Sequence, residues 1–532
     1  MLKSINFYWK NNSCFVNVMV KMNFRTSCGS IFHRQNSGIT IFVHSIKSKY
    51  PFMQKKFFSN LFFIVLLNLL IKPLYIFGID VQVQNTVGAA DYGLYFSLLN
   101  FSFLLNIFLD IGVTNYNTKN TAQNPNTLSK YIGSFFGLKI MLGVLYAFIT
   151  IGFALILGYS DHEMYLLSFF ILNQIFVGLI LYLRSNFAGL HQFKIDAILS
   201  VLDRFLLIII TATLLMGVWT DLTFKIEWFV YAQTFSYGIT LIIGIILTRL
   251  RISRISLKTN KILSFAILRK SVPFAVLILL MMLYTRIDAV MLERLLPDGK
   301  HQAGVYAQGF RLLDAVNMFA FLVAGLLLPI FSRLISEKTS VLPILQSAGK
   351  FLVGSAFVIG ITLAWNTNEI IDFIYAERYD NSAEVFCWLI LSFVPMSFSH
   401  IFGTLLTANN NLKLLNKMAL LGVLLNIILN YFLIPEMKAE GAAIATITTQ
   451  SLTALMQIIL AIKVFKLKID WKSLLRFVFL LSIFIPVTHF LHQEIGKLWS
   501  ILVTVLVGVG LLFMLKLIHI KTLLTMLKSK AE

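Results

Sequence analysis

The chain has 532 residues, of which 58% are hydrophobic and only 13% are charged, and its 45 Lys and Arg outnumber its 24 Asp and Glu to give a net charge of +21. A soluble domain is roughly 45–50% apolar and about 25% charged, so this composition excludes a water-soluble globular protein and a disordered chain. It predicts an all-α protein that crosses a membrane many times.

The first segment, residues 1–52, contains no acidic residue and no apolar run long enough for a signal-peptide core. Met53 is followed by Gln54, Lys55 and Lys56, and then by the first long apolar stretch. We therefore expect translation to begin at Met53 and 1–52 to be a spurious upstream extension. A disordered basic tail is the alternative.

Beyond this point, apolar stretches recur along the whole chain with short connectors between them. Each has about 20 residues, which is the length of one helical crossing. They predict about fourteen transmembrane helices, over residues 58–79, 94–111, 132–158, 164–184, 197–219, 228–248, 271–293, 303–330, 349–366, 384–407, 415–434, 441–463, 474–493 and 498–520.

The charges of the connectors predict the orientation. Connectors after odd-numbered crossings hold sixteen of the 24 acids, whereas Lys and Arg gather in the connectors after even-numbered crossings, such as 249–270. Because loops rich in Lys and Arg stay in the cytoplasm, both termini are expected inside. The basic charge then needs no nucleic-acid partner to explain it.

A short motif recurs at equivalent places in the two halves. Gly93-Leu94-Tyr95 opens the second predicted crossing, and Gly304-Val305-Tyr306 opens the eighth. This indicates two six-helix lobes in a parallel repeat, which is how many alternating-access transporters are built around a central site. The alternative is that the motif merely suits a turn at the membrane interface. The predicted divisions are 53–248 (N-lobe), 249–270 (basic cytoplasmic linker), 271–466 (C-lobe) and 467–532 (two further helices and a cytoplasmic tail).

Ionisable side chains inside the crossings are costly and usually functional. At 1.5 Å per residue, Lys72 and Arg286 lie about 20 Å from the inner ends of their helices, and Arg311 lies roughly 12 Å from the outer end of its own. We expect these three cations to line one cavity and bind an anionic group such as phosphate. An ion pair between Arg311 and a carboxylate three residues later is the alternative. Further candidates for cavity or coupling residues are Asp288, Asp314 and Lys139.

Several functional patterns are absent from the sequence. We find no GxxxxGK[ST] phosphate-binding loop, no HExxH and no paired CxxC, so neither a cofactor nor a metal is expected. The connectors also offer no large loop for a catalytic site, which argues against an enzyme such as a membrane-bound glycan polymerase or transferase.

With these features in view, the chain resembles the polysaccharide and O-antigen flippases of the multidrug/oligosaccharidyl-lipid/polysaccharide (MOP) exporter superfamily. The similarity covers about 57–520. It is carried by Lys72 to Asp80, Val87 to Tyr95, Leu109 to Asn115, Arg286 to Asp288, Gly304 to Tyr306, Leu327 to Pro329 and Asn426 to Ala443.

The resemblance implies two six-helix lobes around a central cavity, plus two C-terminal helices, in a bacterial cytoplasmic membrane. It implies translocation of an undecaprenyl-pyrophosphate-linked oligosaccharide for O-antigen, capsule or exopolysaccharide assembly, with membrane lipids and other assembly proteins as partners. Cavity arginines are thought to hold the pyrophosphate in such flippases, and Arg286 is the best positional match. The alternative is a multidrug or small-metabolite exporter of the same superfamily, although the first crossing lacks the carboxylate that cation-coupled drug exporters often carry there.

Overall fold

The structure is a computed structural model that describes residues 67–68, 70–114, 117–118, 121, 128–190, 192–217, 223–251, 261–468, 470–494 and 497–517. The expected N-terminal extension, 1–52, lies outside these residues. All regular elements in the described part of the chain are helices.

In the first half, residues 70–75 are already helical and continue through a short π-helical turn into α3. In chain order the elements of this half are η1 (Ile76–Asp80), α3 (Val81–Leu104), η2 (Asn106–Leu109), α5 (Leu128–Ile156), α6 (Asp161–Gly189), α7 (Phe193–Leu199), α8 (Leu202–Leu215) and α9 (Ile226–Arg251).

The second half starts with two long helices that are joined by a three-residue turn. Its elements are α10 (Lys261–Leu295), α11 (Gly299–Ser336), α12 (Leu342–Trp365), α13 (Thr367–Ile374), α14 (Ser382–Leu391), α15 (Phe393–Ala408), α16 (Leu412–Phe465), α17 (Trp471–Glu494) and α18 (Lys497–Met514).

These helices overlap the predicted crossings, except that α13 and the first part of α3 lie in predicted connectors. By length and apolarity, ten helices of the described residues are able to span a membrane. This number is below fourteen because α16 holds two predicted crossings, α18 is short, α3 is rich in polar residues, and the first crossing is only partly described. The number fourteen and the domain boundaries stay predictions; within the predicted linker, α9 continues to Arg251 and α10 already begins at Lys261.

Two of the predicted connectors are reduced to a single residue. At Gly88 the backbone turns with φ 81° and ψ 175° inside α3, and at Lys438 it turns with φ 53° and ψ −131° inside α16. A positive φ costs glycine little, which explains Gly88. Lys438 donates to Asp298 across 3.1 Å, so its turn lies beside the turn between α10 and α11. Following the predicted topology, we call this end of the bundle the outer end.

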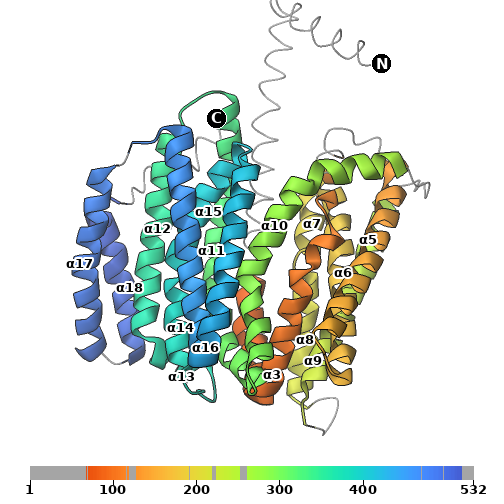
Figure 1. Cartoon of the computed structure of the whole chain (residues 1–532), viewed down its shortest axis with the longest axis horizontal. Coiled ribbons are helices and arrows are strands. Elements are labelled where there is room, and N and C mark those ends of the chain that lie inside the picture. The colour runs from red at the N-terminus through yellow and green to blue at the C-terminus, as the bar shows by residue number, and fades with distance from the viewer. Residues whose placement is uncertain are drawn as a thin grey trace, which may run out of the picture. The chain divides into compact units, whose positions relative to one another are not determined.

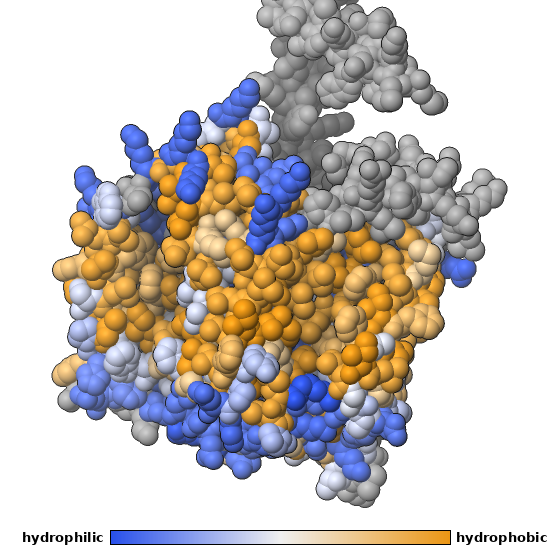
Figure 2. Space-filling model, viewed as in Figure 1, coloured by the Kyte–Doolittle hydropathy of each residue, from blue (hydrophilic) through white to orange (hydrophobic). Residues whose placement is uncertain are grey.

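The two halves meet along α3, α10 and α11. Helix α3 packs against both α10 and α11, and α10 packs against α16. Helices α5–α9 lie on one side of α3 in Figure 1, and α12 to α18 lie on the other side. A broad apolar band crosses the molecule between two hydrophilic margins in Figure 2, as expected for a protein surrounded by lipid.

Candidate functional site

The two glycines of the repeated motif bring α3 and α11 into backbone contact. A Cβ on Gly93 would overlap the carbonyl oxygen of Lys300, and a Cβ on Gly304 would overlap that of Ala89. Each glycine therefore meets the residue four positions before the other glycine. This reciprocity is what a two-fold relation between the repeats requires, and it explains why the motif recurs: only glycine lets the two backbones approach this closely.

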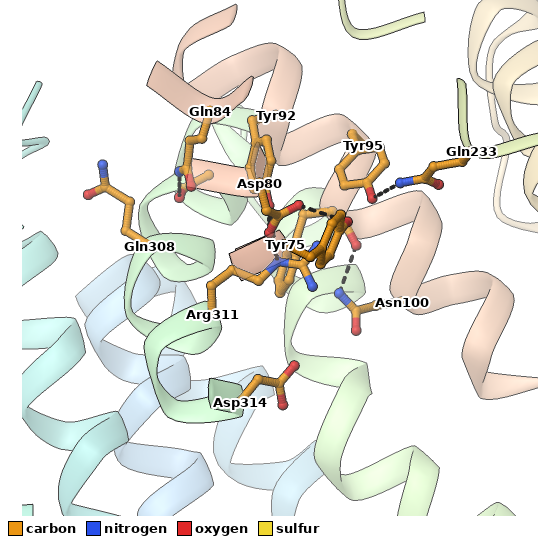
Figure 3. A network of polar contacts seen from close by, with 12 residues as sticks. Tyr75, Asp80, Gln84, Tyr92, Tyr95, Asn100, Gln233, Gln308, Arg311 and Asp314 are labelled. Carbon is orange, nitrogen blue, oxygen red and sulfur yellow. Dashed lines mark hydrogen bonds and ion pairs between the residues drawn. The ribbon is translucent and has the colours of Figure 1, made fainter. Parts of the chain in front are cut away.

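Asp80 lies just inside this contact and is 1% exposed. Its carboxylate accepts hydrogen bonds from Tyr75 (3.3 Å) and Tyr92 (2.7 Å) and forms a 2.8 Å ion pair with Nε of Arg311 (Figure 3). Sequence analysis assigned Asp80 to an outer connector, which is wrong. The helix continues through the π-turn η1 as far as the turn at Gly88, so the carboxylate is buried instead of solvated.

Arg311 is thus fixed by the opposite half of the molecule. Its Nε also donates to the Tyr92 hydroxyl at 3.0 Å, and its guanidinium lies 5.1 Å from the centroid of the Phe96 ring. The alternative pairing with Asp314, three residues later, is not observed. Asp314 lies apart from the Asp80 group in Figure 3. A carboxylate already neutralises this predicted substrate-binding cation.

Arg286, on α10, is held more loosely at the same junction. Its Nη1 donates to Oδ1 of Asn100 on α3 at 3.3 Å and to Oδ2 of Asp314 on α11 at 3.4 Å. The rings of Phe103 and Phe310 lie 5.6 and 5.1 Å from the guanidinium. The side chain remains 23% exposed, compared with 12% for that of Arg311. Arg286 is therefore the better placed of the two to meet a ligand.

Lys72 lies among charges of the first half of the chain. The charged groups that act on it are Arg204, Arg184 and Asp203, all in the first half of the chain. Arg204 in turn lies 4.7 Å from the centroid of the Tyr75 ring, and Arg184 pairs with Asp196 at 2.7 Å. Among the described residues no contact joins Lys72 to Arg286 or Arg311, and the shared cavity and the substrate-binding role of all three cations stay predictions.

Lys139, a candidate coupling residue, is enclosed within the first half. Its side chain is 2% exposed, forms an ion pair with Asp110 and donates to the carbonyl of Leu109 at 3.2 Å. Asp110 also accepts from the backbone N–H of Thr114 at 3.2 Å. These contacts attach α5 to the segment after η2, and they give Lys139 a structural use.

Asp288, on α10, is buried among neutral polar groups. Asn430 donates to one carboxylate oxygen at 2.6 Å, and Thr446 and Tyr306 donate to the other at 2.6 and 3.0 Å. Among the described residues no cation pairs with Asp288, and no group of three or more His, Cys, Asp or Glu is arranged to hold a metal ion. Three donated hydrogen bonds favour the charged carboxylate, whereas burial away from any cation disfavours it, so Asp288 is a candidate site for a proton or a small cation.

A further cluster of charges near the outer end was missed by sequence analysis. Glu163, which closes a capping box with Ser160 at the start of α6, accepts from Arg294 at 3.2 Å and from Lys300 at 2.8 Å. Arg294 also lies 3.5 Å from the centroid of the Tyr159 ring. The cluster ties α6 to α10 and α11. The sequence signals only the cap, because partners more than 130 residues apart leave no local pattern.

Comparison with known proteins shows which family and which solved structures this chain resembles. The sequence profile of a family described as "Polysaccharide biosynthesis protein" matches residues 57–335. A search of the curated proteins gives no match. Among solved structures, the chain is similar to the lipid II flippase MurJ in an inward closed conformation, with a TM-score of 0.65 and 15% identity over 86% of this chain and 97% of that one.

Two other solved transporters share the fold. A MOP superfamily transporter from Pyrococcus furiosus has a TM-score of 0.57 and 13% identity over 78% of this chain and 97% of its own. The MATE transporter VcmN from Vibrio cholerae, in a mutant form, has a TM-score of 0.52 and 14% identity over 79% and 98%. Such identities establish the fold alone. Because the family profile matches more than half of its length, the chain belongs to the family described as "Polysaccharide biosynthesis protein", and its fold is that of solved transporters of the MOP superfamily.

Proposed function

We propose that this transporter moves an undecaprenyl-pyrophosphate-linked oligosaccharide from the inner to the outer leaflet of the bacterial cytoplasmic membrane by alternating access. The observation that carries the proposal is Arg286, an accessible guanidinium where α3, α10 and α11 meet. The family match supports a role in polysaccharide assembly, and a flippase for a lipid-linked substrate has the same fold.

The chemistry of the site suits a diphosphate. A guanidinium offers five donors in a planar fork, which matches phosphate oxygens in pairs. Arg286 commits Nη1 to two long hydrogen bonds, of 3.3 and 3.4 Å, so the remaining donors are available to a ligand. The sugars would follow the head group between the two halves while the prenyl chain stays in lipid. No bond is made or broken, so the protein acts as a transporter and not as an enzyme.

We expect Arg286→Ala to abolish surface polysaccharide while the protein still inserts into the membrane. Charge-assisted hydrogen bonds contribute about 1.5–3 kcal/mol each, so losing them weakens head-group binding roughly tenfold to more than a hundredfold. The measurement is complementation of a deletion strain, scored for the surface polymer and for the accumulated lipid-linked precursor.

Arg333→Ala, which changes an exposed arginine on α11, serves as the control and should retain activity. Wild-type polysaccharide in the Arg286→Ala strain would refute the proposal. Lost drug resistance with normal glycan in the deletion strain would instead favour a small-molecule exporter.

Asp288 is our candidate for the group that couples transport to an ion gradient. Its buried carboxylate accepts only from neutral donors, so uptake of a proton or a small cation removes an otherwise costly charge. We expect Asp288→Asn, which keeps the size and removes the charge, to eliminate the dependence of flux on an imposed ion gradient in proteoliposomes. Asp372→Asn, which changes an exposed acid, is the control. A fully gradient-dependent flux in the Asp288→Asn variant would remove Asp288 from the coupling step.

A further inference from the structure

The two arginines at the junction are neutralised in different ways. Arg311 pairs with a carboxylate that is 1% exposed and is fixed by two tyrosine hydroxyls. Arg286 pairs with Asp314 across 3.4 Å, and the side chains of both partners are accessible, at 23% and 29%. The first pair is built to persist, whereas the second is open to exchange.

Asp314 has little else to hold it in place. Among the described residues its carboxylate makes no hydrogen bond or ion pair other than the one with Arg286. It projects from α11, whereas Arg286 projects from α10 and its second partner, Asn100, from α3. Asn100 and the rings of Phe103 and Phe310 therefore keep the guanidinium in position when the carboxylate moves away.

We propose that Asp314 is a built-in competitor of the substrate: it neutralises Arg286 in the empty transporter, yields the guanidinium to the anionic head group, and returns to displace it. This inference rests on the proposed function of Arg286. An uncompensated guanidinium inside the membrane is costly, so the empty site needs a counter-ion. A diphosphate carries more charge than one carboxylate and engages the guanidinium with two oxygens at once, so it wins the exchange on arrival. The returning carboxylate removes the cost of leaving Arg286 unpaired, which favours release.

If Asp314 competes with the substrate, neutralising Asp314 should strengthen diphosphate binding and slow turnover. Asp314→Asn removes the competitor and should strengthen binding of a diphosphate roughly two- to fivefold, since the pair is accessible to water and its attraction is partly screened. The same variant should slow dissociation and lower the turnover of the lipid-linked substrate several-fold. A merely structural role for Asp314 would lower binding and turnover together.

The test uses the full-length protein in lipid nanodiscs with labelled geranyl diphosphate as the probe, and proteoliposomes for turnover. Asp314→Asn and Asp314→Ala should both bind the probe more tightly and turn over more slowly, whereas Asp314→Glu should resemble the wild type. Either neutral variant suffices if the other fails to fold. Suppose that a folded neutral variant of Asp314 binds the probe no more tightly than the wild type, while Arg286→Ala loses binding. That result would overturn the competitor role of Asp314 and leave the proposed function of Arg286 intact. Unchanged binding in Arg286→Ala overturns both.

Discussion

Replacing Gly304 with alanine is expected to prevent the outer ends of α3 and α11 from closing, and so to stop transport. The added Cβ would overlap the carbonyl oxygen of Ala89, which is backbone and cannot rotate out of the way. Overpacking typically costs about 1–3 kcal/mol, and here the helices relieve it by separating. A membrane-impermeant maleimide should then label a cysteine placed at Gln84, whose side chain donates to the Gly304 carbonyl at 3.0 Å in the closed contact. The native cysteines are first replaced by serine.

The same helix offers a matched control for this experiment. Gly325 also lies on α11, and a Cβ there would meet nothing within 4 Å. Gly325→Ala should leave the labelling rate of the reporter cysteine, measured against the background that keeps Gly304, unchanged and the surface polysaccharide normal. Gly93→Ala should reproduce the Gly304→Ala result, because its Cβ would overlap the Lys300 carbonyl in the reciprocal contact. An unlabelled reporter in a folded, transport-competent Gly304→Ala variant would show that this contact does not close the outer end.

Asp80→Ala should destabilise the folded protein strongly, and much more than Arg286→Ala does. Arg311 would keep its charge at a site with 12% exposure and lose its ion-pair partner. Removing one partner of a buried pair typically costs about 3–5 kcal/mol, because the remaining charge is neither solvated nor paired. The measurement is the midpoint of thermal unfolding in detergent. Arg286→Ala removes an accessible charge and should shift this midpoint far less.

A double variant distinguishes the contribution of the ion pair to stability from that of general packing. Combining Asp80→Leu with Arg311→Met removes both charges and keeps apolar volume, and such replacements are often neutral or stabilising. The double variant should therefore unfold at a higher temperature than either single variant. Additive losses in the cycle would mean that Asp80 and Arg311 do not interact in the folded protein.

Much of the fold is predictable because lipid constrains the sequence so strongly. Every backbone polar group in the hydrocarbon must be satisfied within its own helix, so crossings read as long apolar runs, and α6, α9 and α12 lie where hydropathy places them. The interruption predicted near 435–440 coincides with the turn at Lys438. In contrast, the eight-residue α13 falls in the connector predicted between the crossings 349–366 and 384–407. Ile370 and Ile371 bury one face of it, a pattern too short to predict a helix.

The site is less predictable, because pairing depends on how helices rotate and pack. Depth along a helix says nothing about which face each residue occupies: Arg286 lies on the Phe310 ring and Arg311 on the Phe96 ring, and these two rings contact each other. Lys72 has a depth similar to that of Arg286, but its charged neighbours are Arg204, Arg184 and Asp203. Asp80 was missed because an acid at the end of an apolar run resembles a loop residue. Asn100 and Tyr92 were missed because neutral polar side chains carry no signal of their own.

The single-residue turns at Gly88 and Lys438, together with the short turn at 296–298, make these three outer connectors very short. Antibodies raised against intact cells should therefore find few epitopes there, and external proteases few sites to cut. The segment 375–381, between α13 and α14, is the longest outer connector in the fully described part of the second half. An epitope tag meant to report orientation on living cells belongs at Asp380 and Asn381, the exposed end of this segment, because Ala376 and Glu377 hydrogen-bond Asn85 of α3 and Gln308 of α11.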